Sequence, residues 1–187
     1  MKHKLTLNSI NKLTRILPLS KVQTFSNEIV LIVKPEFLLD TLYFLKNHVL
    51  FQFTILTSIT GVDYPEKKHR FEVVYDLLSV TFNQRIRVKV LVDELESINS
   101  CEGVYPAANW FECEVWDMFG VFFKNHSNLR RILTDYGFEG HPLRKDFPLN
   151  GYIEVRYSEN HKRVISESIE FSQEYRTFNF FGPWNKN

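Results

Sequence analysis

The chain has 187 residues, 44% of them hydrophobic and 24% charged, with a formal net charge of +1. This composition is that of a globular protein with room for one domain and an appendage. The near-zero charge argues against a dedicated nucleic-acid binder, which carries a positive excess. The longest uncharged stretch, residues 47–62, is too short and too polar to span a bilayer, which takes about 20 apolar residues. Any association with a membrane is therefore expected to come through partners.

Cysteine and glycine usage limits the cofactor chemistry that the chain can support. Its two cysteines, Cys101 and Cys113, do not form a C-x-x-C pair, and two thiols cannot by themselves hold an iron–sulfur cluster or a structural zinc ion. The scattered glycines make neither G-x-G-x-x-G nor a P-loop, the usual nucleotide-binding motifs. We therefore expect no catalytic, cofactor-binding or metal-binding residues in this chain, and a reducing compartment.

A basic segment opens the chain. Residues 1–27 contain five basic residues and no acidic residue, which is typical both of a mitochondrial presequence and of a basic first helix in a mature protein. We favour the second interpretation, with a helix over residues 9–17 that Pro18 ends.

The next part of the chain predicts a sheet. Residues 85–92 alternate between apolar and basic side chains, residues 70–80 alternate similarly, and the gap between them suits a hairpin with Asn83 in the turn. Further strands are expected over residues 22–25, 28–33 and 53–62, and a helix over residues 35–47. The pattern predicts an α+β fold, with a mixed or antiparallel sheet and helices packed on one face.

Another helix is expected after residue 109. Asn109 can cap it, Glu112 stands three residues further on as in a capping box, and Gly120 can end it in a left-handed conformation. Its apolar stripe would consist of Phe111, Val115, Met118 and Phe119.

The acidic side chains of this helix, Glu112, Glu114 and Asp117, have two main interpretations. They form a solvated face, or they form a surface for cations that come from a partner or from Arg130 and Arg131. Acid–base catalysis carries low weight, because nothing in the sequence supplies a nucleophile or a substrate pocket.

The sequence GHPLRKDFP, residues 140–148, predicts a stiff and mostly extended loop, because each proline keeps the residue before it out of the helical region. The loop presents Arg144, Lys145 and Asp146, either with an internal surface salt bridge or as a preformed contact element. His126 and His141 make a poor metal site without further ligands, and a structural hydrogen-bonding role is expected for them.

The C-terminal part is expected to be an extended tail. From residue 151 to residue 187 the strand signals are weak and aromatic residues recur without a core of their own. We therefore predict a domain of residues 1–150, followed by a tail of residues 151–187 whose aromatic side chains lie on a partner.

Several long and rare motifs resemble one protein family, the thirty-kilodalton subunits of respiratory complex I, in particular its mitochondrially encoded members. They are WFECEVWDMFGVFFKNHSNLRRILTDYGFEGHPLRKDFPLNGYIEVRY from Trp110, GVDYP from Gly61, RFEVVYDLLS from Arg70 and RIRVKV from Arg85. Two positions depart from the family pattern. Cys113, which lies off the expected apolar stripe, stands where an arginine is usual, and Ser127 replaces the proline that commonly follows His126.

This resemblance implies a non-redox core structural subunit in the hydrophilic, quinone-module arm of proton-pumping NADH:ubiquinone oxidoreductase. Such a subunit would lie on the matrix side of the mitochondrial inner membrane. Its partners would be other hydrophilic-arm subunits, chiefly the one that forms most of the quinone pocket, and these partners would bind flavin, iron–sulfur clusters and ubiquinone. The expected interface residues are Glu112, Glu114, Asp117, His126, Arg130, Arg131, His141, Arg144, Lys145 and Asp146.

Two other identities remain open at this point. One is the equivalent subunit of a plastid dehydrogenase or of a membrane-bound hydrogenase. The other is a free-standing module that binds RNA or protein through aromatic residues beside Arg85, Arg87 and Lys89.

Overall fold

The computed structural model describes residues 13–25, 28–171, 173–174 and 176. It divides the chain into two compact units, residues 1–147 and residues 148–187. The helix expected over residues 9–17 begins outside the described residues, and residues 13–16 of it are helical. The aromatic residues near the C-terminus, Tyr175, Phe178, Phe180, Phe181 and Trp184, also lie outside the described residues.

The first unit is built on a five-stranded sheet in the order β1-β2-β5-β4-β3. Its strands are β1 (Leu19–Phe25), β2 (Glu28–Val33), β3 (Ile55–Asp63), β4 (Phe71–Ser79) and β5 (Gln84–Val92). The β2–β5 pair is parallel and the other pairs are antiparallel. The sheet is therefore mixed, and Asn83 occupies the β4–β5 turn with a φ of 50°, as the sequence predicts.

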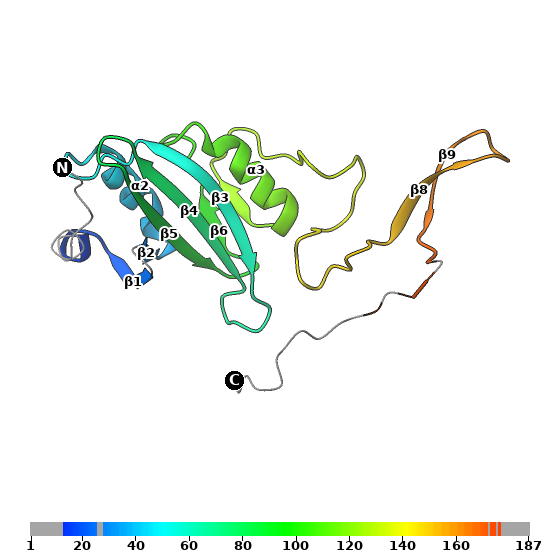
Figure 1. Ribbon diagram of the computed structural model, residues 1–187, viewed down its shortest axis with the longest axis horizontal. Helices are drawn as coiled ribbons and strands as arrows, with labels where there is room; N and C mark the ends of the chain where they lie inside the picture. The colour runs from blue at the N-terminus through cyan, green and yellow to red at the C-terminus, as the bar shows by residue number, and fades with distance from the viewer. Residues whose placement is uncertain (1–12, 26–27, 172, 175, 177–187) are drawn as a thin grey trace. The chain divides into compact units, whose positions relative to one another are not determined.

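Helices cover one face of this sheet. They are the short 3-10 helix η1 (Pro35–Phe37), α2 (Leu38–Asn47) and α3 (Ala108–Phe119). The alternating side chains of β4 and β5, among them Tyr75 and Val88, are buried in one cluster together with Leu42 of α2 and Val115 of α3. Figure 1 shows β3, β4 and β5 running side by side. The predicted α+β architecture is confirmed, because alternation along a strand puts every second side chain into a single core.

Two short strands accompany α3. β6 (Ser97–Asn99) precedes the helix, β7 (Phe122–Lys124) follows it, and the two pair in parallel. The backbone N–H of Ser100 also donates to the carbonyl oxygen of Lys124 at 2.9 Å. The loop before α3 and the loop after it are thus joined at one end of the helix.

The second unit contains a β-hairpin. β8 (Ile153–Ser158) and β9 (Arg163–Ser168) are antiparallel partners, and the N–H of Ile169 extends the ladder to the carbonyl oxygen of Tyr152. This hairpin differs from the extended tail predicted for residues 151–187. Its strand signal is weak because polar and charged residues fill many positions of both strands, whereas the cross-strand pairing depends on the backbone. No helix among the described residues is long and apolar enough to cross a membrane.

Candidate functional site

The beginning of α3 differs from the predicted capping box. Ala107 occupies the N-cap position with helical angles and no side-chain cap. Asn109 lies inside the helix, and its amide donates to Glu102 at 2.8 Å. Glu112 points into the core. Asn109 and Glu112 therefore have the spacing of a capping box but do not form one.

Glu112 anchors the turn that follows β6. Its side chain is fully buried and accepts hydrogen bonds from the Ser100 hydroxyl at 2.5 Å and from the backbone N–H of Cys101 at 2.7 Å. Burial raises the pKa of Glu112, and these hydrogen bonds offset the rise only in part. Glu112 is therefore neither part of a solvated acidic face nor open to a partner, in contrast to both main interpretations of its sequence.

Asp117 anchors a second segment, residues 131–134. Its fully buried carboxylate accepts N–H donors from Ile132, Leu133 and Thr134 at 2.9–3.2 Å, the Thr134 hydroxyl at 2.7 Å and Arg131 at 3.2 Å. Burial raises the pKa of this carboxyl, but the donors more than offset burial and hold it below its ordinary value. The donors also explain how an acid is tolerated in the last helical turn, where the helix dipole disfavours it.

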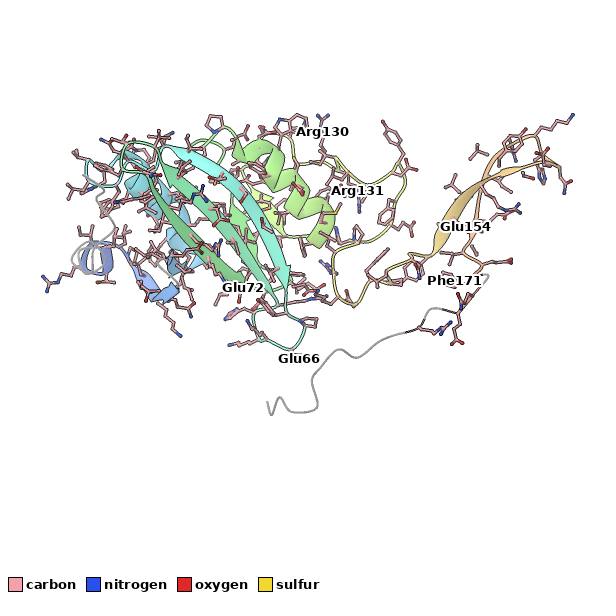
Figure 2. All side chains as sticks on the ribbon, in the orientation of Figure 1. Glu66, Glu72, Arg130, Arg131, Glu154 and Phe171 are labelled. Carbon is pink, nitrogen blue, oxygen red and sulfur yellow. The ribbon has the colours of Figure 1, made fainter. Side chains whose placement is uncertain are left out.

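The two arginines that follow β7 have different roles. Arg131 pairs with Asp117, as one of the two interpretations of the acidic helix predicts. Its guanidinium also lies over the ring of Trp116, 5.5 Å from the ring centre. Arg130 is exposed. Figure 2 labels both on the segment that passes α3.

Residues 140–148, here called the 140–148 loop, cap the end of α3. The carbonyl oxygen of Asp117 lies 3.0 Å from Nδ1 of His141, that of Met118 accepts the N–H of Leu143 at 3.1 Å, and that of Phe119 accepts Nε of Arg144 at 2.6 Å. A carbonyl can only accept, so Nδ1 of His141 carries the proton. The loop thus supplies donors to three successive carbonyl groups that the helix itself leaves unpaired.

The 140–148 loop is not extended as predicted. It forms two consecutive turns, in which the N–H of Arg144 donates to His141 at 3.2 Å and the N–H of Phe147 donates to Arg144 at 3.1 Å. Pro142 takes the second position of the first turn, where its fixed φ is favourable. A proline excludes the helical region only for the residue before it, so the rule used for the sequence did not exclude turns.

An ion-pair network holds the same loop against the sheet. Arg70 donates to both carboxylate oxygens of Asp63 at 2.8 and 3.1 Å and pairs with Asp146 at 3.0 Å. Arg144 pairs with Glu94 at 2.5 Å. The Arg70–Asp63 pair is shielded from solvent, because Arg70 is 17% exposed and the Asp63 side chain is fully buried, whereas Glu94 and Asp146 lie at the surface, where ion pairs contribute less.

Asp63 joins this network to the backbone of the loop. Its oxygen Oδ2 accepts the N–H of Lys145 at 2.8 Å in addition to Arg70. Burial raises the pKa of Asp63, but hydrogen bonds from Arg70 and from the Lys145 amide outweigh burial and leave the pKa below its ordinary value. Asp63, Arg70 and Glu94 are not among the interface residues predicted from the sequence. A signal was present, because Asp63 and Arg70 fall within two of the family-like motifs.

His126 and Cys113 share a buried contact on the other side of α3. Nδ1 of His126 accepts the N–H of Asn128 at 3.1 Å, so the proton is on Nε2, which lies 3.1 Å from the carbonyl oxygen of Asn109. Sγ of Cys113 lies 3.8 Å from the same Nε2. Cys113 lies off the apolar stripe, as expected, and outside the main core cluster, yet it is buried because His126 and residue 128 cover that side of the helix.

The ten predicted interface residues divide by exposure. Glu114, Arg130, Lys145 and Asp146 are exposed, although Asp146 pairs with Arg70. The other six are buried or half-buried and bond within the chain. They are Glu112, Asp117, His126, Arg131, His141 and Arg144. The structure brings most of the predicted residues together around α3, where they hold loops in place.

The basic side chains of the RNA-binding alternative are largely engaged. Arg87 pairs with Asp76 at 2.7 Å, and Lys89 pairs with Glu72 at 3.2 Å. Figure 2 labels Glu72 on the sheet. Paired cations offer less charge to phosphates, so this geometry does not favour that alternative.

Comparison with known proteins gives consistent matches. Residues 31–153 match the family model described as respiratory-chain NADH dehydrogenase, 30 Kd subunit. The NADH-ubiquinone oxidoreductase subunit 9 of Reclinomonas americana is 59% identical over 159 residues, which cover 85% of this chain and 78% of the relative. The protein of the same name from Prototheca wickerhamii is 58% identical over 160 residues, covering 86% and 83%. The NADH dehydrogenase (ubiquinone) iron-sulfur protein 3 of Solanum tuberosum is 58% identical over 151 residues, covering 81% and 80%.

Proposed function

Because the chain belongs to the family of 30 Kd subunits of respiratory-chain NADH dehydrogenase, we propose that it is a structural core subunit without a redox centre of its own. In this role it supports electron transfer from NADH to ubiquinone by holding neighbouring subunits in register. The observation that carries the proposal is the arrangement around α3. Its buried carboxylates and the end of the helix organise loops that come from three parts of the chain.

The cysteine content supports a role without a cluster. A cluster held by thiolates takes four of them, and this chain has two, Cys101 and Cys113, both buried. One relative carries the name iron-sulfur protein 3, so the iron content of this chain is a direct test. We expect the purified chain to contain no stoichiometric iron and to show no flavin or cluster absorbance. A stoichiometric chromophore would overturn this part of the proposal.

Exposed groups beside α3 provide one contact surface of the first unit. The charged members are Glu114 on the helix and Arg130 after it, with Lys145 on the 140–148 loop. Leu133 and Leu143 are more than half exposed, and their backbone N–H groups bond to adjacent residues of α3. Exposed apolar side chains on a hydrogen-bonded backbone, with exposed charges beside them, are typical of a protein interface with a polar rim.

The hairpin of the second unit has one apolar face. Ile153, Val155 and Tyr157 of β8 lie on that face with Val164, which pairs with Tyr157, and all four are between 55% and 65% exposed. The opposite face carries the charged residues, including the ion pair between Arg156 and Glu167 at 2.7 Å. An isolated two-stranded hairpin is at best marginally stable in water. We therefore assign the apolar face to contact with another subunit.

The proposed partners and cellular location follow from membership of the same family. The partners are other subunits of the hydrophilic arm, chiefly the one that forms the quinone pocket, and the chain is a peripheral subunit on the matrix side of the mitochondrial inner membrane. The aromatic residues that recur along the C-terminal part suit a segment that wraps around such a partner.

Two substitutions at adjacent positions of β8 test the proposal. Val155→Lys places a charge on the apolar face, whereas Glu154→Lys changes the charge of the opposite face by a larger amount. Each variant is expressed in place of the native subunit, and native electrophoresis of membranes measures its incorporation into the NADH dehydrogenase complex. We expect Val155→Lys to reduce incorporation at least about tenfold and Glu154→Lys to leave it within about twofold. Absence of the wild-type chain from the complex would overturn the proposed function, and equal incorporation of the two variants would overturn the assignment of the face.

A further inference from the structure

A cluster of potential metal ligands lies in two loops of the first unit, outside the set of residues described above. His69 stands two residues before β4, and Asp93 directly follows β5. Because Phe71 pairs with Val92 in the sheet, the loop before β4 and the loop after β5 are neighbours. Glu96 belongs to the second loop. Figure 2 marks the first loop by its residue Glu66.

The distances in this cluster suit a single cation. One ligand atom from each of His69, Asp93 and Glu96 lies within 4.8 Å of the others. Nδ1 of His69 is 2.8 Å from Oδ1 of Asp93. Two ligands about 2.0–2.1 Å from the same tetrahedral zinc ion are themselves roughly 3.3 Å apart, so a small separation of these two atoms admits the ion.

Nδ1 of His69 and Oδ1 of Asp93 lie at ion-pair distance. Neither atom forms a hydrogen bond with the described residues, and both atoms are closed to solvent although their side chains are partly exposed. A cation placed between a ring nitrogen and a carboxylate oxygen stabilises such a close approach.

Backbone hydrogen bonds order the turn that carries two of these side chains. The N–H of Asp93 donates to Oε2 of Glu96 at 3.4 Å, and the N–H of Glu96 donates to the carbonyl oxygen of Asp93 at 3.2 Å. Arg70, next to His69, is held by Asp63 and Asp146. The backbone on both sides of the cluster is therefore bonded within the chain.

We propose that His69, Asp93 and Glu96 bind a divalent cation of the zinc class through one imidazole nitrogen and two carboxylate oxygens. A mixed nitrogen and oxygen donor set suits Zn²⁺ and its transition-metal neighbours, whereas Mg²⁺ and Ca²⁺ prefer oxygen ligands alone. Water completes a tetrahedral shell. The two carboxylates balance the charge of the cation, and the bound ion ties the loop before β4 to the loop after β5. The role is structural and does not depend on the proposed function.

Titration of the metal-stripped, full-length chain with ZnCl₂ by isothermal calorimetry tests the site. We expect one equivalent to bind, and His69→Gln and Glu96→Gln each to weaken binding at least about tenfold. Glu96 is exposed, so its replacement tests ligation without a risk to folding. His161→Gln, a change of the same kind in the hairpin unit, should leave binding unchanged. No binding, or binding that His69→Gln and Glu96→Gln do not alter, would overturn the proposal.

Cobalt distinguishes this site from a site that uses the thiol of Cys113 near His126. Co²⁺ bound to nitrogen and oxygen shows only weak visible bands, whereas a thiolate ligand adds an intense charge-transfer band in the near ultraviolet. We expect the weak bands alone, lost in His69→Gln. An intense band would place the metal at a cysteine and exclude the proposed site. Zn²⁺ should also raise the melting temperature of the wild type but not that of Glu96→Gln.

Discussion

Nε of Arg144 donates to the carbonyl oxygen of Phe119 at 2.6 Å across 25 positions of sequence. This bond places a cation at the negative end of the dipole of α3, where positive charge is stabilising. Together with His141 and the N–H of Leu143, it ends the helix with donors from a distant loop. The motif that looked like an exposed contact element is therefore first a helix cap.

Gly120 is required where this cap approaches the helix. Its φ is +80°, and a Cβ atom would lie 2.6 Å from both Arg144 and His141. We expect Gly120→Ala to lower the free energy of unfolding by roughly 3 kcal/mol, the sum of left-handed strain and overpacking. Gly137 has a φ of +72° with nothing within 4 Å of such a Cβ, so Gly137→Ala should cost only about 1 kcal/mol. Urea unfolding of the full chain measures both, and equal losses would contradict the close approach as the cause.

Arg144→Met should destabilise the isolated chain. The substitution removes a charged donor from the Phe119 carbonyl and from Glu94, and charged hydrogen bonds contribute about 1.5–3 kcal/mol. Lys145→Met removes the same charge one residue later, but the Lys145 side chain is exposed and only its backbone N–H bonds to Asp63. That control should change the free energy of unfolding by less than about 0.5 kcal/mol. If chemical denaturation finds the two variants alike, the capping role is wrong.

Asp117→Asn should be strongly destabilising near neutral pH. The three backbone N–H groups of residues 132–134 share one oxygen, Oδ2, which the amide oxygen can replace. The amide nitrogen cannot accept from Arg131 at the other oxygen, and the buried pair loses its negative charge, at a cost of about 3 kcal/mol. The pKa of Asp117 lies below its ordinary value, so its contribution is complete above that ordinary value and is lost as the pH falls through the folded-state pKa. The difference from the wild type should therefore shrink in acid. Glu114→Gln, at an exposed carboxylate of the same helix, is the control and should change the free energy of unfolding near neutral pH by less than about 0.5 kcal/mol.

Glu112→Gln should show the opposite dependence on pH. The pKa of Glu112 is raised, chiefly by burial, so the wild type is most stable below the ordinary glutamate pKa and loses stability as the pH rises through the raised value. A neutral glutamine does not titrate. The stability of the wild type relative to Glu112→Gln should therefore decline as the pH rises above the ordinary glutamate pKa. Thermal melts across this range measure it, and a constant difference would mean that burial does not disfavour the Glu112 carboxylate.

Periodicity made the sheet predictable. Apolar residues at every second position of β4 and β5 can lie together only on one side of a strand, and the structure buries them on the side that α2 and α3 cover. The left-handed end of α3 was also visible in the sequence, because Gly120 tolerates a positive φ. These features depend on neighbours in sequence, so the sequence is sufficient for them.

Whether each acidic residue on α3 is buried or exposed was not predictable in the same way. Glu112, Glu114 and Asp117 lie within two turns of one helix, yet two are buried and one is exposed. The donors that make burial tolerable come from residues 100–101 and 131–134, far from these acids in sequence. Sequence alone determined the central strands β4 and β5, their buried sides and the family, because alternation and motifs are local. Only the tertiary structure decided which charges are enclosed, because a buried charge is stable only where distant segments bring enough hydrogen-bond donors to it.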